Sequence, residues 1–433
     1  MKIIQISILT PTSENIRGTS ALPYHLIKGS LSPALPRREG RLDICIYTFN
    51  NNEIPDEKIS EVEKELKITI KKMPLPKWFR FIFRFHLLFL RLFLKYPIHN
   101  YIKLPIQYVE EIKSQKPDVI WVYGAELSRI VNQFDGFQRI HTLPDSEALY
   151  YYRMLGQRFV THDWKKFWRC AMMYPKFLAL ERGYSKGATI HYHLVGEEDV
   201  NFLKKMNPGI QAHFIRHPHY EVSPQLTIDS GQFSPCERPE VEWKIKFHQP
   251  KIKVLIAGQY NHYMKQEADL LCEELFGGRS GKTERRVKSE ELAQHYAITF
   301  LGKGWEEHVE TLREAGYEVD HIKFALDYIE EITKHDIQIT PIAIGTGTKG
   351  KVLDALANGL LVIGTPYALE NIAVKHGESC IEYRQPQEVI DVLIEIPDNR
   401  EKYEKMATKG CLSILKYHDR KAISQELFSF FMR

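Results

Sequence analysis

The residues from Asp336 to Thr365 read DIQITPIAIGTGTKGKVLDALANGLLVIGT, and this stretch decides the fold. An apolar run up to Pro341 leads into a glycine-rich turn, then into a helical pattern that ends at Gly359, and then into a second apolar run. This order predicts a strand, a turn, a helix and a second strand parallel to the first. Glycines let the backbone approach an anion closely, and the free N–H groups at a helix start bind anions. The turn is therefore predicted to hold a phosphate.

Short apolar runs separated by helix-length segments recur on both sides of this turn. Their alternation predicts an α/β chain with crossover connections and largely parallel sheets. Strands are expected at residues 2–9, 43–49, 118–123, 139–142 and 189–195, and again at residues 253–258, 298–301, 318–322, 336–341 and 360–363. The two series predict two similar lobes with a cleft between them, where ligands of open α/β sheets usually bind.

A linker is expected between the two series of strands, at residues 223–250. This segment is rich in Pro, Ser and Glu, a composition that resists regular structure. We therefore expect one lobe at residues 1–222 and a second at residues 251–411. An amphipathic helical tail follows at residues 412–433.

The composition of the chain excludes several classes of protein. Its 433 residues suffice for two to three domains of about 100–200 residues each. Hydrophobic residues make up 43% and charged residues 26%, which argues against a disordered or collagen-like chain. The net charge of +4 is too small for a protein that binds nucleic acid by neutralising phosphates, so no nucleic-acid partner is expected.

The six cysteines and the first residues bear on the cellular compartment. The cysteines lie far apart without a C-x-x-C pair, which is typical neither of a zinc site nor of a disulfide scaffold. Residues 1–10 alternate between polar and apolar side chains and contain a single basic residue. This pattern predicts a first strand rather than a signal peptide. We therefore expect a cytoplasmic protein.

The glycine-rich turn itself fits three interpretations. Residues 345–350 match the dinucleotide-binding pattern G-x-G-x-x-G, but the following strand ends without the acidic residue that would bind a ribose. Residues 345–351 match most of the P-loop pattern, but Val352 stands where a Ser or Thr would hold magnesium. The third interpretation comes from a resemblance to a known family.

The segment from Pro341 to Thr365 resembles the donor-site segment of the retaining glycosyltransferases of family 4, which have the GT-B fold. The matching pattern is Gly345-x-Gly347-x-Lys349-Gly-Lys351-Val-Leu-Asp354-Ala-Leu-Ala-x-Gly359. Weaker similarities, at Asp145-Ser146, Glu181, residues 196–199 and residues 214–218, extend the resemblance over about the whole chain. It implies a GT-B fold, with two Rossmann-like lobes facing each other across a cleft. The first lobe would bind the acceptor, the second the nucleotide sugar, and the tail would pack back toward the first lobe.

The resemblance implies roles for the residues of the turn. Those expected to bind the donor there are Gly345, Thr346, Gly347, Thr348, Lys349 and Asp354. Gly345, Gly347 and Lys349 match positions that bind the diphosphate, whereas Lys351 either assists or faces solvent. Asp354 matches a glutamate that binds the ribose hydroxyls. Thr346 replaces a glutamate that contacts the donor sugar, so the sugar is held differently here.

Four residues outside the turn complete the expected site. Lys265, after the strand at 253–258, resembles in placement a lysine that reaches the phosphates, and Gly18 matches the place where the first lobe approaches the donor. His141 and Asp145 lie at the carboxyl end of a strand, where functional groups of parallel sheets gather. His141 is expected either to polarise a sugar hydroxyl or to pack in the core. With Lys349, His141 and Asp145 are the expected catalytic residues.

No metal ion and no cofactor other than the nucleotide-diphosphate sugar are expected. The H-x-H pairs His191/His193 and His217/His219 each place two imidazoles on one face of a strand. No carboxylate or cysteine cluster accompanies them, so we interpret them as structural or acceptor-side histidines. Helix-start N–H groups and Lys349 would stabilise the departing diphosphate in place of a metal ion.

Two further segments stand out by composition. Residues 77–95, KWFRFIFRFHLLFLRLFLK, are predicted to form one helix whose four basic residues share a stripe among aromatic and aliphatic side chains. Each central Arg or Lys costs about 2.5–3.5 kcal/mol in a bilayer, so the helix fits the membrane interface rather than a span. The alternatives are a core helix with its charges outward, or an oligomer contact. Residues 277–290, polar and basic, are predicted to be a mobile loop.

The expected function is that of a retaining, metal-independent hexosyl- or related glycosyltransferase. It would act on a hydroxyl of a glycolipid or polysaccharide acceptor, at the inner face of the membrane through residues 77–95. Two alternatives remain open. One is an epimerase or hydrolase that acts on a nucleotide sugar with the same fold. The other is a catalytically silent partner that binds nucleotide sugars without turnover.

Overall fold

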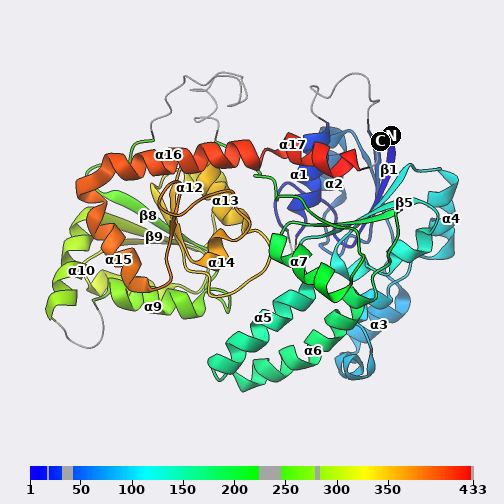
Figure 1. Cartoon of the computed structure of the whole chain (residues 1–433), viewed down its shortest axis with the longest axis horizontal. Coiled ribbons are helices and arrows are strands. Elements are labelled where there is room, and N and C mark those ends of the chain that lie inside the picture. The colour runs from blue at the N-terminus through cyan, green and yellow to red at the C-terminus, as the bar shows by residue number, and fades with distance from the viewer. Residues whose placement is uncertain (17–18, 32–41, 224–244, 278–282, 431–433) are drawn as a thin grey trace. The chain divides into compact units, whose positions relative to one another are not determined.

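The structure is a computed structural model of the chain, and it describes residues 1–16, 19–31, 42–223, 245–277 and 283–430 (Figure 1). The chain divides into two compact units. The first unit comprises Met1–Pro218 and Arg420–Arg433, and the second comprises His219–Asp419. The sequence predicts these boundaries at residues 222 and 412.

The first unit is built on a seven-stranded parallel sheet. Its strand order is β3-β2-β1-β4-β5-β6-β7. The strands are β1 (Lys2–Ser7), β2 (Asp43–Thr48), β3 (Thr69–Lys72), β4 (Val119–Tyr123), β5 (Gln138–Leu143), β6 (Ile190–Leu194) and β7 (Ala212–Phe214). The central strand β4 reads VIWVY and is buried along its whole length. A continuous apolar run of this kind is typical of a parallel strand that is covered on both faces.

Helices cover both faces of this sheet. Ile120 and Val122 join one apolar cluster, whereas Val119 and Trp121 join another, because successive side chains of a strand point to opposite faces. The α-helices are α1 (Ala21–Ser30), α2 (Asp56–Leu66), α3 (Lys77–Arg84), α4 (Ile106–Ser114), α5 (Glu147–Val160), α6 (Trp164–Arg182), α7 (Glu197–Met206) and α17 (Arg420–Ser429). Short 3-10 helices are η1 (Leu88–Phe93), η2 (Ile98–Tyr101), η3 (Ala125–Leu127) and η4 (Ile130–Phe134).

The C-terminal helix α17 belongs to the first unit and packs against α1. A Cβ atom on Gly29 would lie 2.3 Å from Ser424 Oγ, so a residue without a side chain is needed where the two helices meet. Phe428 of α17 contacts Trp121 of β4 edge-on, with ring centroids 5.6 Å apart. These contacts tie the end of the chain to the core of the first unit.

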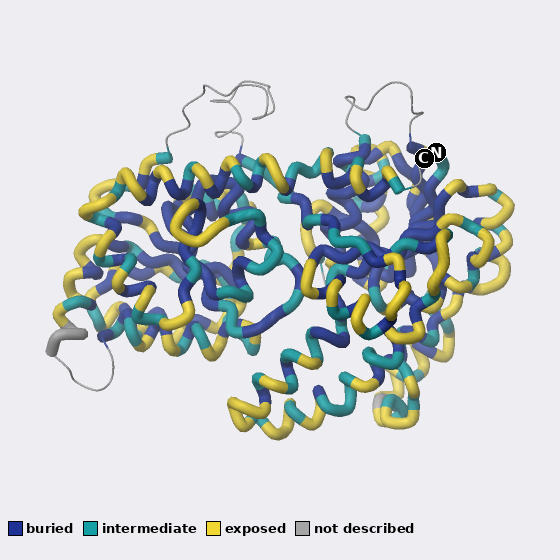
Figure 2. Tube along the Cα trace, in the orientation of Figure 1, coloured by how far each residue is buried: buried dark blue, intermediate teal, exposed yellow. Residues whose placement is uncertain are grey.

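The second unit is built on a six-stranded parallel sheet with the order β10-β9-β8-β11-β12-β13. Its strands are β8 (Ile252–Ala257), β9 (Tyr296–Leu301), β10 (Glu318–Ile322), β11 (Ile337–Thr340), β12 (Leu361–Gly364) and β13 (Ile381–Glu382). Its helices are α9 (Lys265–Leu275), α10 (Thr283–His295), α11 (Glu306–Glu314), α12 (Tyr328–Ile332), α13 (Gly350–Ala357), α14 (Pro366–Leu369), α15 (Pro386–Glu395), η5 (Pro397–Asn399) and α16 (Arg400–Tyr417). Figure 2 shows the strands of both units as buried, with exposed residues on the outer helices.

The two parallel sheets confirm the predicted α/β chain with two Rossmann-like lobes. All ten predicted strands are present. The strands β3, β7 and β13 were missed. They have two to four residues each and lie at sheet edges, where a short run gives little periodic signal.

Two local predictions are wrong. Residues 77–95 do not form one helix, because α3 ends at Arg84 and His86 has a φ of 53°, in the left-handed region, before η1 begins. The four basic residues therefore do not share one helical stripe. Residues 283–290, expected in a mobile loop, belong to α10, while residues 278–282 lie outside the described part of the chain. No helix in the described residues has the length and apolar character that a membrane span requires.

Candidate functional site

The glycine-rich turn lies at the carboxyl end of β11 in the second unit. Strand β11 pairs in parallel with β12, from Ile337↔Leu361 to Thr340↔Gly364, so the segments that follow both strands emerge at one edge of the sheet. Thr365 joins the two segments, because its Oγ1 donates a hydrogen bond to Ile342 O over 2.7 Å. The turn thus follows a strand whose four residues are all buried.

The turn folds around the ammonium of Lys349. Lys349 Nζ donates to the carbonyl oxygens of Thr346 over 2.5 Å and of Gly347 over 3.1 Å. Gly347 has a φ of 63°, a left-handed conformation that favours glycine. A Cβ atom on Gly345 would lie 2.9 Å from Lys349 Cε, so glycine also leaves room for the lysine. These contacts place a positive charge at the turn.

The helix α13 begins directly after Lys349. It spans Gly350–Ala357, and its N-cap residue Lys349 makes no side-chain cap. Among the described residues, nothing accepts a hydrogen bond from the N–H groups of Gly350 and Lys351. Free N–H groups at a helix start, together with the helix dipole, bind anions. The turn therefore offers both amide donors and an ammonium to an anion.

A second ammonium, that of Lys351, lies at the carboxyl end of β8. A Cβ atom on Gly258 would lie 3.4 Å from Lys351 Nζ. The Lys351 side chain keeps contact with solvent, but protein atoms crowd its ammonium and lower its pKa, while the nearby Asp354 opposes this effect. The sequence left the role of Lys351 open, and the structure brings it close to the loop after β8.

Lys265, by contrast, is held by neighbours on its own side of that loop. Its Nζ donates to Tyr260 Oη over 2.5 Å and to Asp269 Oδ2 over 3.0 Å, and the hydrogen bonds to both residues raise its pKa. The ammonium is thus already paired at the start of α9. Lys351 is the better placed of the two lysines to approach a ligand at the turn.

Asp354 is buried on α13, with 7% of its surface exposed. One carboxylate oxygen accepts a hydrogen bond from the backbone N–H of Tyr220, while Oδ1 is buried and has no partner among the described residues. Burial raises the pKa of Asp354 to about 7, the charge of Glu221 adds to this effect, and Lys351 opposes it. An unpartnered buried oxygen of this kind is what a ribose hydroxyl would satisfy.

The raised pKa of Asp354 predicts a pH-dependent stability. Because the folded state binds the Asp354 proton more tightly than the unfolded state, stability falls as pH rises from about 4 through 7. Asp354→Asn removes the titrating carboxyl. Relative to the parent chain, we therefore expect the variant to gain more free energy of unfolding at pH 8 than at pH 5, by on the order of 2–3 kcal/mol. Urea unfolding at both values measures this change. The exposed Asp398→Asn serves as control, and an equal pH dependence in both variants would contradict the assignment.

Two of the expected first-unit residues lie in the described part of the chain. His141 is completely buried in β5, where its Nε2 shares a hydrogen bond with Gly124 O over 3.0 Å, and burial lowers its pKa to about 4. The structure therefore places His141 in the core, where its hydrogen bond holds the backbone of Gly124, directly after β4. Asp145 is half-buried just beyond the end of β5. Gly18 lies outside the described residues.

The two H-x-H pairs are structural in their placement. His193 is buried and bonds to Thr142 and to Ile215 O, and burial lowers its pKa to about 4. His191 shares a hydrogen bond of 3.0 Å with His213. His217 is buried next to Pro218. Within the described ranges, no three His, Cys, Asp or Glu side chains come together as metal ligands would.

One residue at the turn was missed by the sequence analysis. Asn371 has a φ of 67°, and its Nδ2 donates a hydrogen bond to Gly347 O over 3.2 Å. It lies in the segment after β12, six residues beyond Thr365. The predicted parallel pairing of β11 and β12 could have indicated this contact, because it brings the segments after both strands to one edge of the sheet.

Comparisons with known proteins agree with this architecture. The family described as "Glycosyl transferase-like" matches residues 284–429, which include the turn and α13. No curated protein sequence matches the chain with significance. Among solved structures, HepE from Anabaena in complex with UDP is similar with a TM-score of 0.58 and 10% identity, over 99% of each chain.

Two further structures show the same likeness. Sucrose-phosphate synthase from Thermosynechococcus elongatus has a TM-score of 0.60 at 10% identity, over 100% of this chain and 98% of its own. WaaG, a glycosyltransferase involved in lipopolysaccharide biosynthesis, has a TM-score of 0.56 at 11% identity, over 98% of this chain and 99% of its own. The chain therefore has the GT-B fold, and its residues 284–429 are similar to the family described as "Glycosyl transferase-like".

Proposed function

We propose that the protein is a retaining glycosyltransferase that moves a hexosyl or related sugar from a nucleotide-diphosphate sugar to a hydroxyl of an acceptor. One observation carries the proposal. The turn at residues 345–349 presents the Lys349 ammonium together with two free N–H groups of α13, in a domain that matches the glycosyl transferase-like family. Such donors suit a diphosphate.

The donor is expected to lie along α13, with its diphosphate at the start of the helix. Asp354, one turn into the helix, would accept hydrogen bonds from the ribose hydroxyls through its unpartnered oxygen. Solved HepE structures contain UDP, UDP-glucose, or UDP with glucose, so uridine nucleotides are the first donors to test.

In the proposed reaction the protein positions the two substrates and stabilises the charge that develops. The bond between the anomeric carbon and the β-phosphate oxygen breaks, and the acceptor oxygen bonds to the same face of that carbon. The acceptor proton passes to the departing phosphate. Lys349 and the helix N–H groups stabilise the negative charge that develops on the phosphate, as donors in an oxyanion hole do. The proposed transfer is metal-independent.

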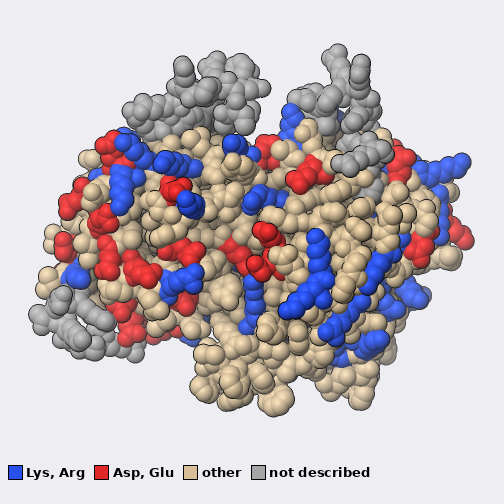
Figure 3. Space-filling view, viewed as in Figure 1, with Lys and Arg blue, Asp and Glu red and all other residues tan. Residues whose placement is uncertain are grey.

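A glycolipid or a polysaccharide intermediate is the proposed acceptor, reached by a cytoplasmic protein bound to the inner face of the membrane. This part of the proposal is supported by apolar side chains on the first unit. Phe85, directly after α3, is 55% exposed, and Phe93, at the end of η1, is 80% exposed. Figure 3 shows Lys and Arg side chains gathered in the area of α3. Basic and apolar side chains together bind anionic bilayers.

The membrane contact predicts a charge-dependent sedimentation. We expect Arg80→Glu combined with Arg84→Glu to lower binding to phosphatidylglycerol vesicles at least tenfold, because each basic residue near an anionic surface contributes about 1 kcal/mol. Both side chains are exposed, so the fold should persist. Lys402→Glu with Lys405→Glu, on α16 of the second unit, is the matched control. Unchanged sedimentation of the α3 variant would remove the membrane contact.

A ligand screen followed by product analysis tests the proposed function. A ligand at about 100 times its dissociation constant adds about 2.7 kcal/mol to stability, so the cognate nucleotide diphosphate should raise the melting temperature. Products are then analysed with and without acceptor. Transfer to an acceptor with retained configuration supports the proposal. Turnover of the donor alone would indicate an epimerase or hydrolase, and binding without turnover a silent partner.

A further inference from the structure

An irregular segment of the second unit, residues 219–223, runs beside the helix α13. It belongs to neither a helix nor a strand, yet it is fixed at both ends. At one end, the His219 N–H donates a hydrogen bond to His418 O over 2.9 Å. At the other end, the Ser223 N–H donates to Asn358 Oδ1 over 2.7 Å. Both anchors belong to the second unit, so the segment is held against α13 within that unit.

Asn358 makes the larger part of this attachment. It directly follows the last residue of α13 and is 6% exposed. Besides accepting from the Ser223 N–H, its amide donates through Nδ2 to Glu221 O over 3.1 Å and to Asp354 O over 2.8 Å. At this length only an amide side chain supplies two donors and an acceptor. Asn358 therefore joins the end of α13 to residues 221 and 223 in a way that alanine or serine cannot.

The segment carries a hydrogen-bond donor for Asp354. The Tyr220 N–H donates to one oxygen of the Asp354 carboxylate. Glu221, whose carbonyl oxygen Asn358 holds, is the next residue along the chain. The side chain of Val222 packs against the apolar cluster to which α13 contributes. Tyr220 thus lies between two fixed points, so the direction of its N–H is fixed as well.

The fixed N–H sets the orientation of the Asp354 carboxylate. Tyr220 occupies one oxygen, which leaves Oδ1 as the oxygen without a partner among the described residues. The torsion that turns a carboxylate about its last bond is broad and roughly two-fold, so an unheld carboxylate rotates readily. The aspartate is also one methylene shorter than the glutamate that it matches in family 4, so it reaches less far. The bond from Tyr220 therefore decides which oxygen meets a ribose.

We propose that Asn358 is a positioning residue for nucleotide recognition. It holds residues 220–223 against α13, so that the Tyr220 N–H orients the Asp354 carboxylate toward the ribose hydroxyls. The inference rests on the proposed function, and it assigns a role to a position that the pattern of the turn leaves open. It predicts that the preference for a ribose with free hydroxyls depends on Asn358.

Titration calorimetry with UDP and with 2′,3′-dideoxy-UDP tests this role without requiring turnover. Burial raises the pKa of Asp354 to about 7, so measurements at pH 8 keep most of the carboxylate ionised. The parent chain should bind UDP about tenfold more tightly than the dideoxy nucleotide, because hydrogen bonds from hydroxyls to a carboxylate are charge-assisted. Asn358→Ala should lower the affinity for UDP about tenfold and leave the affinity for dideoxy-UDP unchanged.

A second variant and a double-mutant cycle separate positioning from folding. Asn358→Ser keeps a hydroxyl that can bond to Asp354 O at the helix end but cannot reach residues 221 and 223, so it should show the same loss of UDP affinity. In the Asp354→Ala background, Asn358→Ala should have no further effect on UDP affinity, because the group that it positions is gone. Additive effects of the two changes would overturn the inference, as would an equal loss of affinity for both nucleotides.

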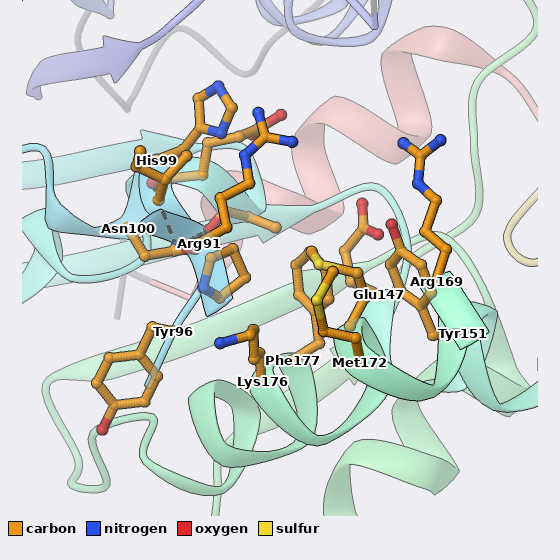
Figure 4. A pocket seen from close by; sticks show the side chains of 15 residues that line it. Arg91, Tyr96, His99, Asn100, Glu147, Tyr151, Arg169, Met172, Lys176 and Phe177 are labelled. Atoms are coloured by element: carbon orange, nitrogen blue, oxygen red, sulfur yellow. Dashed lines mark hydrogen bonds between the residues drawn. The ribbon is translucent and has the colours of Figure 1, made fainter. Parts of the chain in front are cut away.

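Asn100 supplies the matched control. This buried asparagine of η2 lines a pocket of the first unit, and its Nδ2 donates to Ala125 O over 2.6 Å and to Glu126 O over 3.2 Å (Figure 4). Asn100→Ala should also lower the melting temperature, yet keep the preference for UDP over dideoxy-UDP. A parent chain that binds both nucleotides equally would overturn the inference alone, whereas a parent chain that binds neither would overturn the proposed function.

Discussion

Lys349→Ala should lower the affinity for UDP by about 10- to 100-fold and the rate of sugar transfer by a further 100- to 1,000-fold. The first effect follows because a charge-assisted hydrogen bond contributes about 1.5–3 kcal/mol. The second follows because Lys349 would stabilise charge that grows on the departing phosphate, and removal of one such donor costs about 10²–10³ in kcat. Titration calorimetry and a transfer assay measure the two effects separately.

A change in the turn itself must be distinguished from the loss of charge. Lys349 Nζ bonds to Thr346 O and Gly347 O, so the alanine variant also loses contacts inside the turn. Lys349→Arg keeps the charge and should recover part of the UDP affinity, whereas Lys349→Met keeps the length and should not. Lys409→Ala, an exposed lysine on α16, should behave as the parent chain. Full activity of Lys349→Ala would contradict the assignment.

Gly347→Val should abolish measurable UDP binding, with a loss of at least 100-fold in affinity. Gly347 has a φ of 63°, and a β-branched side chain there is a strong conformational outlier. The turn would move to relieve this strain, and the carbonyl that now accepts hydrogen bonds from Lys349 and Asn371 would turn away. The ammonium would then lose its position beside the start of α13.

Gly377→Val provides the matched control for this experiment. Gly377 has a φ of 76°, and a Cβ atom there would meet nothing within 4 Å, so it carries similar backbone strain without crowding. Both variants should lose about 1–3 kcal/mol of unfolding free energy. Only Gly347→Val should lose UDP affinity. An equal loss of affinity in both variants would show that general destabilisation, not the turn, is responsible.

The sequence was sufficient for the sheets but not for the short or irregular elements. The central strands are continuous apolar runs, such as VIWVY in β4, and these are recognisable without tertiary contacts. The segment at 77–95 was misjudged because its apolar and basic residues follow a helical spacing throughout. The reversal at His86 depends on a single positive φ, which no periodicity reveals.

The site was predictable where it lies in one contiguous segment. The turn, Lys349 and the start of α13 follow from residues 345–351 alone. Asn371 and Lys351 were missed or left open because their positions depend on the pairing of β11 with β12 and on the approach of α13 to the loop after β8. The burial of His141 likewise depends on tyrosines from other elements, such as Tyr184, that pack against its ring.

A crystal structure of the chain with UDP tests the central claim most directly. We expect density for the diphosphate within hydrogen-bond distance of Lys349 Nζ and of the Gly350 and Lys351 N–H groups, with the ribose at Asp354. Nucleotide density at any other place in the second unit, or a diphosphate that leaves these groups unbound, would contradict it.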